Sequence, residues 1–204
     1  NEHTPEQVST NAIANIVETS AASVTDMIKK LAVKGLLHYE PYKGVRLSSQ
    51  GAKIATELVR KHRLWETFLV TKLGFSWEDV HDIAEQLEHV QSDMLVDKLN
   101  AYLGFPKYDP HGDPIPNAEG RFTLREQSLL SRSEVGSKVI LVGVKKHQKD
   151  FLKHLNKLKI SLGCEIHIQS KEEYDSLLSV SIDKNYPITL SNQITSNLFV
   201  RNSQ

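Results

Sequence analysis

The apolar residues of the first fifty positions follow helical spacing at first and then alternate. A first helix is predicted, with start signals at Pro5 and Thr10. A second helix is predicted for 21–34, capped by Ser20 and ended by Gly35. Val8, Ile13, Ile16 and Val17 give the first helix its roughly helical apolar spacing, and the inward positions of the second helix are Val24, Met27, Ile28, Leu31 and Ala32. The run 36–47, with a turn at 41–44, then reads as a β-hairpin.

Three more amphipathic helices are predicted between residues 52 and 103. They span 52–73, 81–90 and 93–103, with Ser76 and Asp79 as a capping pair before the second. Their packing positions are Ile54, Leu58, Leu64, Trp65, Phe68 and Leu69 on the first, Ile83, Leu87 and Val90 on the second, and Met94, Leu95, Leu99 and Tyr102 on the third. Because these helices have no sheet of their own, they indicate a helical dimer interface; the alternative is a self-contained helical subdomain.

Beyond residue 103 the pattern becomes irregular and then typical of short strands. Residues 104–120 are rich in proline and glycine and are predicted to be a linker. Apolar runs predict strands at 135–142, 165–168, 177–182, 186–190 and 197–200, and a short helix at 150–157. Short strands at close spacing favour a small β-barrel.

Composition narrows the class of protein without identifying it. The 204 residues are 39% hydrophobic and 25% charged, as in soluble globular proteins. No apolar run approaches the roughly 20 residues that cross a bilayer, and no signal peptide is recognised. The lone cysteine, Cys164, excludes an internal disulfide and fits a reducing cytoplasm.

The zero net charge conceals three differently charged segments. Residues 1–63 carry 9 basic and 6 acidic side chains, residues 64–120 carry 3 and 11, and residues 121–204 carry 13 and 8. An acidic centre between basic ends suggests a cation site inside and a polyanion partner at one end.

The N-terminal order of helix, short turn, helix and basic hairpin is that of a winged helix-turn-helix. Hydroxyls near the start of its second helix can reach base edges or phosphates, and lysines suit phosphates. The predicted DNA-contacting residues are Ser20, Ser23, Thr25, Lys29 and Lys30 on the helix and Lys43 and Arg46 on the wing. The alternative is a small helical domain with a polar surface.

The stretch 81–90 holds the chain's most distinctive chemistry. At helical spacing its two histidines and two glutamates share one face; they are His81, Glu85, Glu88 and His89. Two imidazoles and two carboxylates so close together suit a divalent metal, although a solvated helix face has the same composition. His62 and Glu66 are also neighbours on one helix face.

Several motifs together resemble one family. They are Lys61-His62-Arg63-Leu64-Trp65-Glu66, Val80-His81-Asp82, Leu87-Glu88-His89-Val90, Ser92-Asp93, Gly112-Asp113-Pro114-Ile115-Pro116 and the wing 41–47. In this order they are similar to the diphtheria toxin repressor and manganese transport regulator family. The resemblance implies a cytoplasmic, homodimeric, metal-activated transcriptional repressor with a winged-helix domain, a helical dimerisation domain and an SH3-like domain of FeoA type.

The resemblance also implies two metal sites. Glu85, Glu88 and His89 match the family's primary site, where a glutamate at position 85 is typical of manganese-type members and suits hard Mn²⁺. The ancillary site is matched by His62, Glu66 and His81, with Asp109 and His111 from the linker and His147 and Asp150 from the last domain. The family's first helix, which supplies further primary ligands, would precede Asn1.

The predicted fold is therefore α+β, with a winged helix-turn-helix DNA-binding domain at 1–50, an all-helical dimerisation domain with linker at 51–120 and a small SH3-like β-barrel at 121–204. The predicted function is a repressor, activated by Mn²⁺ or Fe²⁺, that binds a double-stranded DNA operator as a homodimer and controls metal uptake. A metal-dependent hydrolase is the first alternative, but the HExxH motif and nucleophile arrangements are missing. A metal sensor or chaperone without a DNA role is the second.

Overall fold

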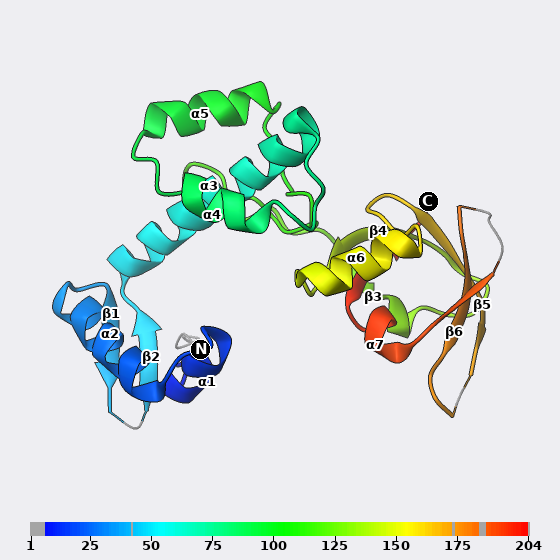
Figure 1. Cartoon of the computed structure of the whole chain (residues 1–204), viewed down its shortest axis with the longest axis horizontal. Coiled ribbons are helices and arrows are strands. Elements are labelled where there is room, and N and C mark those ends of the chain that lie inside the picture. Colours follow the sequence, from blue (N-terminus) through cyan, green and yellow to red (C-terminus); the bar gives the residue numbers. More distant parts are fainter. Residues whose placement is uncertain (1–6, 42, 173, 184–186, 204) are drawn as a thin grey trace. The chain divides into compact units, whose positions relative to one another are not determined.

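The computed structural model describes residues 7–41, 43–172, 174–183 and 187–203. The chain divides into two compact units, residues 1–58 and 59–204 (Figure 1). The α+β class is confirmed, since helices dominate up to residue 102 and a six-stranded sheet follows. No helix in the described ranges is long and apolar enough to cross a membrane.

The first unit is a small helical cluster with a hairpin. It contains α1 (Thr10–Ile16), α2 (Ala21–Val33), β1 (Leu37–Glu40) and β2 (Gly44–Leu47). The side chains of Ser9 and Ser20 accept hydrogen bonds from backbone amides in the first turns of α1 and α2, which satisfies donors that a helix start leaves free. The core consists of Ala14, Val24, Ile28 and Val45.

Two expectations for this unit need correction. Val8 is not helical but pairs with Val45 beside the hairpin, because α1 begins only after its cap at Ser9. Met27 was predicted inward but is 58% exposed, since the small core is filled by Val24 and Ile28 on the neighbouring face. Pro5 lies outside the described residues.

Three helices follow the hairpin: α3 (Ser49–Leu73), α4 (His81–Leu87) and α5 (Asp93–Tyr102). In the second unit they enclose two small cores, one of Leu64, Val96, Leu99 and Ile115 and one of Leu69, Val80 and Ala84. The predicted packing positions Ile54, Leu58, Val90, Met94, Leu95 and Tyr102 are exposed instead.

The helix predicted for 81–90 is shorter than expected. It ends at Leu87, and Glu88 forms its C-cap. His89 follows in a turn, so the two histidines and two glutamates of this stretch do not share one helical face.

Residues 104–120 are more than a linker. They contain no helix, but Asp109, His111 and Ile115 are 6%, 1% and 6% exposed. Ile115 packs into the α3–α5 core. The amide of Val144 donates to the carbonyl of His111, so the segment is held against both the helices and the sheet.

The last part of the chain forms an antiparallel sheet with helices on one side (Figure 1). Its elements are β3 (Ser128–Leu129), the 3-10 helix Leu130–Arg132, β4 (Lys138–Val144), α6 (Lys149–Lys157), β5 (Glu165–Lys171), β6 (Leu178–Ile182), β7 (Ile188–Leu190), α7 (Asn192–Thr195) and β8 (Leu198–Asn202). Leu152 and Leu155 of α6 are buried in its core.

The predicted β-barrel is wrong for the described residues. The strand order is β3-β8-β4-β5-β6-β7, so β3 and β7 are the two edges and do not pair with each other. They contain only two and three residues, which is too little backbone to close a sheet through a continuous ladder.

Candidate metal centre

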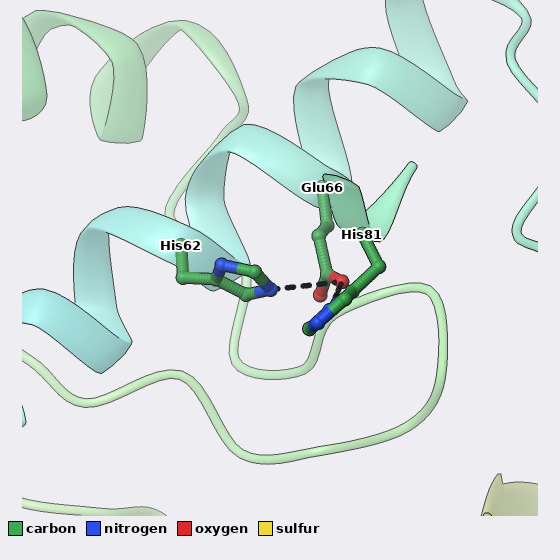
Figure 2. A group of neighbouring side chains, drawn as sticks. All are labelled: His62, Glu66 and His81. Atoms are coloured by element: carbon green, nitrogen blue, oxygen red, sulfur yellow. Dashed lines mark ion pairs between the residues drawn. The ribbon is translucent and has the colours of Figure 1, made fainter. Parts of the chain in front are cut away.

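Glu66 is the centre of a cluster of histidines. It is 3% exposed on α3, and one carboxylate oxygen, Oε1, lies 3.1 Å from Nε2 of His62 and 3.7 Å from Nδ1 of His81. Figure 2 shows both rings directed at this carboxylate. The ligand atoms of these three residues all lie within 4.8 Å of one another, so a single cation can contact them together.

The segment 104–120 supplies a second group of ligand atoms around the carboxylate of Glu66. Glu66, Asp109 and His111 are all buried, and their ligand atoms also lie within 4.8 Å of one another. Oδ1 of Asp109 accepts from the backbone amides of His111 and Asp113, at 2.8 and 3.0 Å. These bonds fold the segment into a tight turn, in which Gly112 has a φ of +88° that favours glycine.

One atom in this group has no hydrogen-bond partner among the described residues. Nε2 of His111 donates to the carbonyl oxygen of Trp77 at 2.8 Å, which leaves Nδ1 as the lone-pair nitrogen of the neutral ring. Nδ1 is buried without a hydrogen bond and lies 3.5 Å from Oε2 of Glu66. A buried nitrogen that lacks a partner is costly, and a neutral imidazole with its other nitrogen fixed by a carbonyl is a typical metal ligand.

The pKa values of the cluster reflect burial opposed by charge. Burial disfavours ionisation of Glu66, but the contacts with His111 and His62 outweigh it and hold the pKa of this carboxyl well below its usual range. Burial likewise opposes charge on His62 and His111, and their neighbouring carboxylates outweigh it and raise both pKa values. Burial, followed by the charges of Glu66 and Asp113, raises the pKa of Asp109 to about 6.

His62 connects this cluster to one residue of the predicted primary site. Its Nδ1 lies 2.6 Å from Oε2 of Glu88, which is 8% exposed. Glu85 and His89 are exposed and belong to neither group of ligand atoms found in the described residues. The structure therefore brings Glu88, but not the other two, close to His62.

The last domain contributes one of its two predicted residues to this neighbourhood. The ring of His147 stacks on that of His111 with centroids 4.7 Å apart, and its Nε2 lies 3.8 Å from Asp113. Asp150 is exposed in the first turn of α6 and belongs to neither group of ligand atoms in the described ranges.

The pairing of Arg63 with Asp113 beside the site was not predicted from the sequence. Arg63 reaches from α3 to Asp113 at 3.1 Å and to the carbonyl of Pro114 at 2.5 Å. The two positions stand in motifs that resemble the family, but nothing in their spacing indicates that they pair. Arg63 fixes the turn that presents Asp109 and His111.

The predicted DNA-contacting residues lie mainly at the surface of the first unit. Ser23, Lys29 and Lys30 are exposed on α2, and Lys30 pairs with Asp26 at 2.9 Å. The hydroxyls of Ser20 and Thr25 already bond within the helix, Ser20 as its cap and Thr25 to the carbonyl of Ala21. On the hairpin, Lys43 pairs with Glu40 at 2.8 Å, and Arg46 is partly buried.

The donor set fits a divalent cation. Carboxylate oxygens and imidazole nitrogens are ligands that Mn²⁺, Fe²⁺ and neighbouring metals accept. The unpartnered Nδ1 of His111 and the buried carboxylates of Glu66 and Asp109 are the features that a cation would satisfy.

Three family profiles together match most of the chain. They are the iron dependent repressor N-terminal DNA binding domain over residues 1–45, the iron dependent repressor metal binding and dimerisation domain over 48–117, and the FeoA domain over 129–202. The profiles are thus those of a DNA-binding regulator with a metal binding and dimerisation domain.

Individual relatives match nearly all or part of the chain. A solved manganese-dependent transcriptional repressor in complex with manganese is 34% identical, with a TM-score of 0.85, over 99% of this chain and 94% of that one. The diphtheria toxin repressor of Corynebacterium jeikeium is 36% identical over 107 residues, 52% of this chain and 45% of that protein. A probable metal transport system membrane protein of Chlamydia trachomatis is 43% identical over 86 residues, 42% of this chain and 19% of that protein.

The chain belongs to the iron-dependent repressor family, the family of the diphtheria toxin repressor and of manganese-dependent repressors. This is a family of DNA-binding transcriptional repressors and not of enzymes, which removes the hydrolase alternative. The matched segments span less than half the length of the curated relatives named above.

Proposed function

We propose that this protein is a metal-activated transcriptional repressor that controls genes of metal uptake and homeostasis. In this proposal it binds Mn²⁺ or Fe²⁺ and, as a homodimer, a double-stranded DNA operator in the cytoplasm. The observation that supports it most is that a buried set of metal-type ligands around Glu66 occurs in the same chain as an iron-dependent-repressor DNA-binding segment.

The domain boundaries stay as predicted within this proposal. Residues 1–50 act as a winged helix-turn-helix, 51–120 as the metal-binding and dimerisation domain and 121–204 as an SH3-like domain. The helix, helix and hairpin order of 10–47 supports the first of these assignments. The finer labels rest on the resemblance of the motifs.

The metal would be held at two neighbouring places. Glu66 with His62 and His81 forms one shell, which Asp109 and His111 extend and beside which His147 of the last domain lies; Asp150 is not part of it. Glu85, Glu88 and His89 form the second, regulatory site. When bound, the metal supplies positive charge that offsets buried carboxylates. The ligand residues come from α3, α4 and the 104–120 segment, so binding favours the arrangement in which these elements are together.

A titration of promoter DNA with and without metal tests the function. Labelled promoter DNA of metal-uptake genes should be retarded in a gel by the protein with Mn²⁺ or Fe²⁺, and much less after chelation. Metal-independent binding, or metal binding without any DNA binding, would contradict the proposal; the latter is the behaviour of a sensor or chaperone.

Replacement of Lys29 and Lys30 by alanine should weaken binding to every DNA sequence. Both lysines are exposed on α2, and each lysine that contacts a phosphate contributes about 0.9 to the slope of log affinity against log salt. The slope should therefore fall by up to about 2, measured by fluorescence anisotropy. Lys138→Ala/Lys171→Ala, exposed on β4 and β5, is the matched control. Changes at Ser23 should alter base preference instead.

Replacement of Met94 and Tyr102 by glutamate should produce a monomer. They are 74% and 64% exposed on α5, and α5 lies within the segment that matches the metal binding and dimerisation profile. Sedimentation at several concentrations should show the change, whereas Lys138→Glu, at an exposed position of the sheet domain, should leave a dimer. A dimeric Met94/Tyr102 variant would place the interface elsewhere.

A further inference from the structure

The FeoA domain has a strip of lysines that the proposed metal site does not use. Residues 145–159 contain six lysines and a single acidic residue, Asp150. The remainder of 121–204 has seven basic and seven acidic side chains, so this segment holds the whole positive excess of the domain. Helix α6 forms its centre.

The orientation of α6 is fixed by its apolar side. Leu152 and Leu155 are 1% and 0% exposed in the core of the sheet domain. The other side of the helix faces solvent, and Lys153 and Lys157 there are exposed. Their i,i+4 spacing places these two charges on one face.

One lysine of the strip has an intramolecular role. Lys149 pairs with Asp79 at 2.5 Å, and Asn156 bonds to Trp77 and Glu78, both at 2.9 Å. These contacts attach α6 to the segment before α4. The other five lysines are exposed, and none has a carboxylate within ion-pair distance among the described residues. We call them the lysine patch: Lys145, Lys146, Lys153, Lys157 and Lys159.

The stability of α6 does not account for this patch. Lys145 and Lys146 precede the N-terminus of the helix, where the helix dipole disfavours positive charge. Lys157, in the last turn, and Lys159, just after the C-cap, are placed favourably. Five exposed positive charges in one short segment, none of them paired with a carboxylate among the described residues, are better explained by a partner of opposite charge.

We propose that the lysine patch is a second DNA-contacting surface, which binds duplex phosphates irrespective of sequence and adds to the contacts of α2. The inference rests on the proposed function, because DNA is the polyanion which that function brings to the protein. A lipid surface fits less well, since the apolar residues of α6 are buried in the domain core and leave no apolar face to insert.

A triple variant that removes three positive charges tests the patch. Lys145→Gln, Lys153→Gln and Lys157→Gln are combined in the full chain, and binding to a labelled duplex of mixed sequence is measured without metal over a range of salt. The slope of log affinity against log salt should fall by roughly 2 to 3, since each lost phosphate contact removes about 0.9. Thermal unfolding and the Mn²⁺ affinity from calorimetry should stay as in the parent.

A matched control separates the patch from net charge. Arg132→Gln, Lys138→Gln and Lys171→Gln remove the same charge from exposed positions of the same domain and should leave the slope unchanged. An equal loss in both triple variants, or none in the patch variant, would overturn the inference. So would a loss confined to binding of anionic phospholipid vesicles, or to self-association in sedimentation.

The two proposals can fail independently. Failure of the proposed function appears in the unmodified protein, as promoter binding that metal does not change. Failure of the proposed DNA contact at the lysine patch appears in the triple variant, as an unchanged slope of log affinity against log salt on mixed-sequence duplex. Neither metal nor operator is involved in that measurement.

Discussion

Replacement of Glu66 by glutamine is expected to lower the affinity for Mn²⁺ by at least about a hundredfold and to remove the metal-dependent part of DNA binding. Glu66 alone belongs to both groups of ligand atoms. An amide keeps the shape of the side chain but lacks the negative charge. Changes to mere supporting residues of metal sites typically cost about 10- to 100-fold, and loss of a shared ligand should cost more. Calorimetry and gel retardation measure the two effects.

The same helix provides the control. Glu57 is exposed on α3, so Glu57→Gln removes the same charge away from the cluster and should leave Mn²⁺ binding unchanged. If Glu66→Gln binds and responds to metal as the parent does, then Glu85, Glu88 and His89 act without the buried cluster. The proposed importance of Glu66 would then be wrong.

Affinity for Mn²⁺ is expected to rise steeply from about pH 5 to about pH 7.5, because ligands must lose their protons to bind metal. The pKa values of His62 and His111 are raised by neighbouring carboxylates, and burial raises the pKa of Asp109 to about 6. All three residues therefore hold protons at the acidic end of this range. Release of one to two protons per metal corresponds to about one to two decades of affinity per pH unit.

The free energy of unfolding of the metal-free protein should fall over the pH range in which the Mn²⁺ affinity rises. The two histidines contribute to the free energy of unfolding in full below their unfolded pKa near 6.5. This contribution is lost as pH rises through their raised folded pKa values. For Asp109, it is complete below 3.8 and is lost as pH rises through about 6. Glu66 has a depressed pKa, so its contribution is present above 4.5 and is lost only on acidification. The increase in Tm caused by Mn²⁺ should therefore grow with pH.

Calorimetry in buffers of different ionisation enthalpy counts the released protons. Asp109→Asn should reduce that number and flatten the dependence around pH 6, while Asp175→Asn, at an exposed hairpin position, should change neither. An affinity that is independent of pH would show that the metal binds elsewhere than this cluster.

The sequence alone determined those features that depend on local spacing. The boundaries of α2 follow from a serine cap and a glycine stop, and the hairpin from alternation around a turn. His62 and Glu66 face the same side because they are one helical turn apart. The order of motifs then sufficed to predict the family, which the profiles and relatives confirm.

Only the tertiary structure decided which residues gather around Glu66. Asp109 and His111 come from a segment whose composition predicts a loop. They are buried because Arg63, the carbonyl of Trp77 and the amide of Val144 all bond to this segment. The end of α4 at Leu87 divides a stretch that periodicity alone would keep helical. The open sheet has the same origin, since pairing at its edges depends on residues far apart in the chain. Local spacing fixes which residues share a face, but contacts between distant segments decide which faces meet.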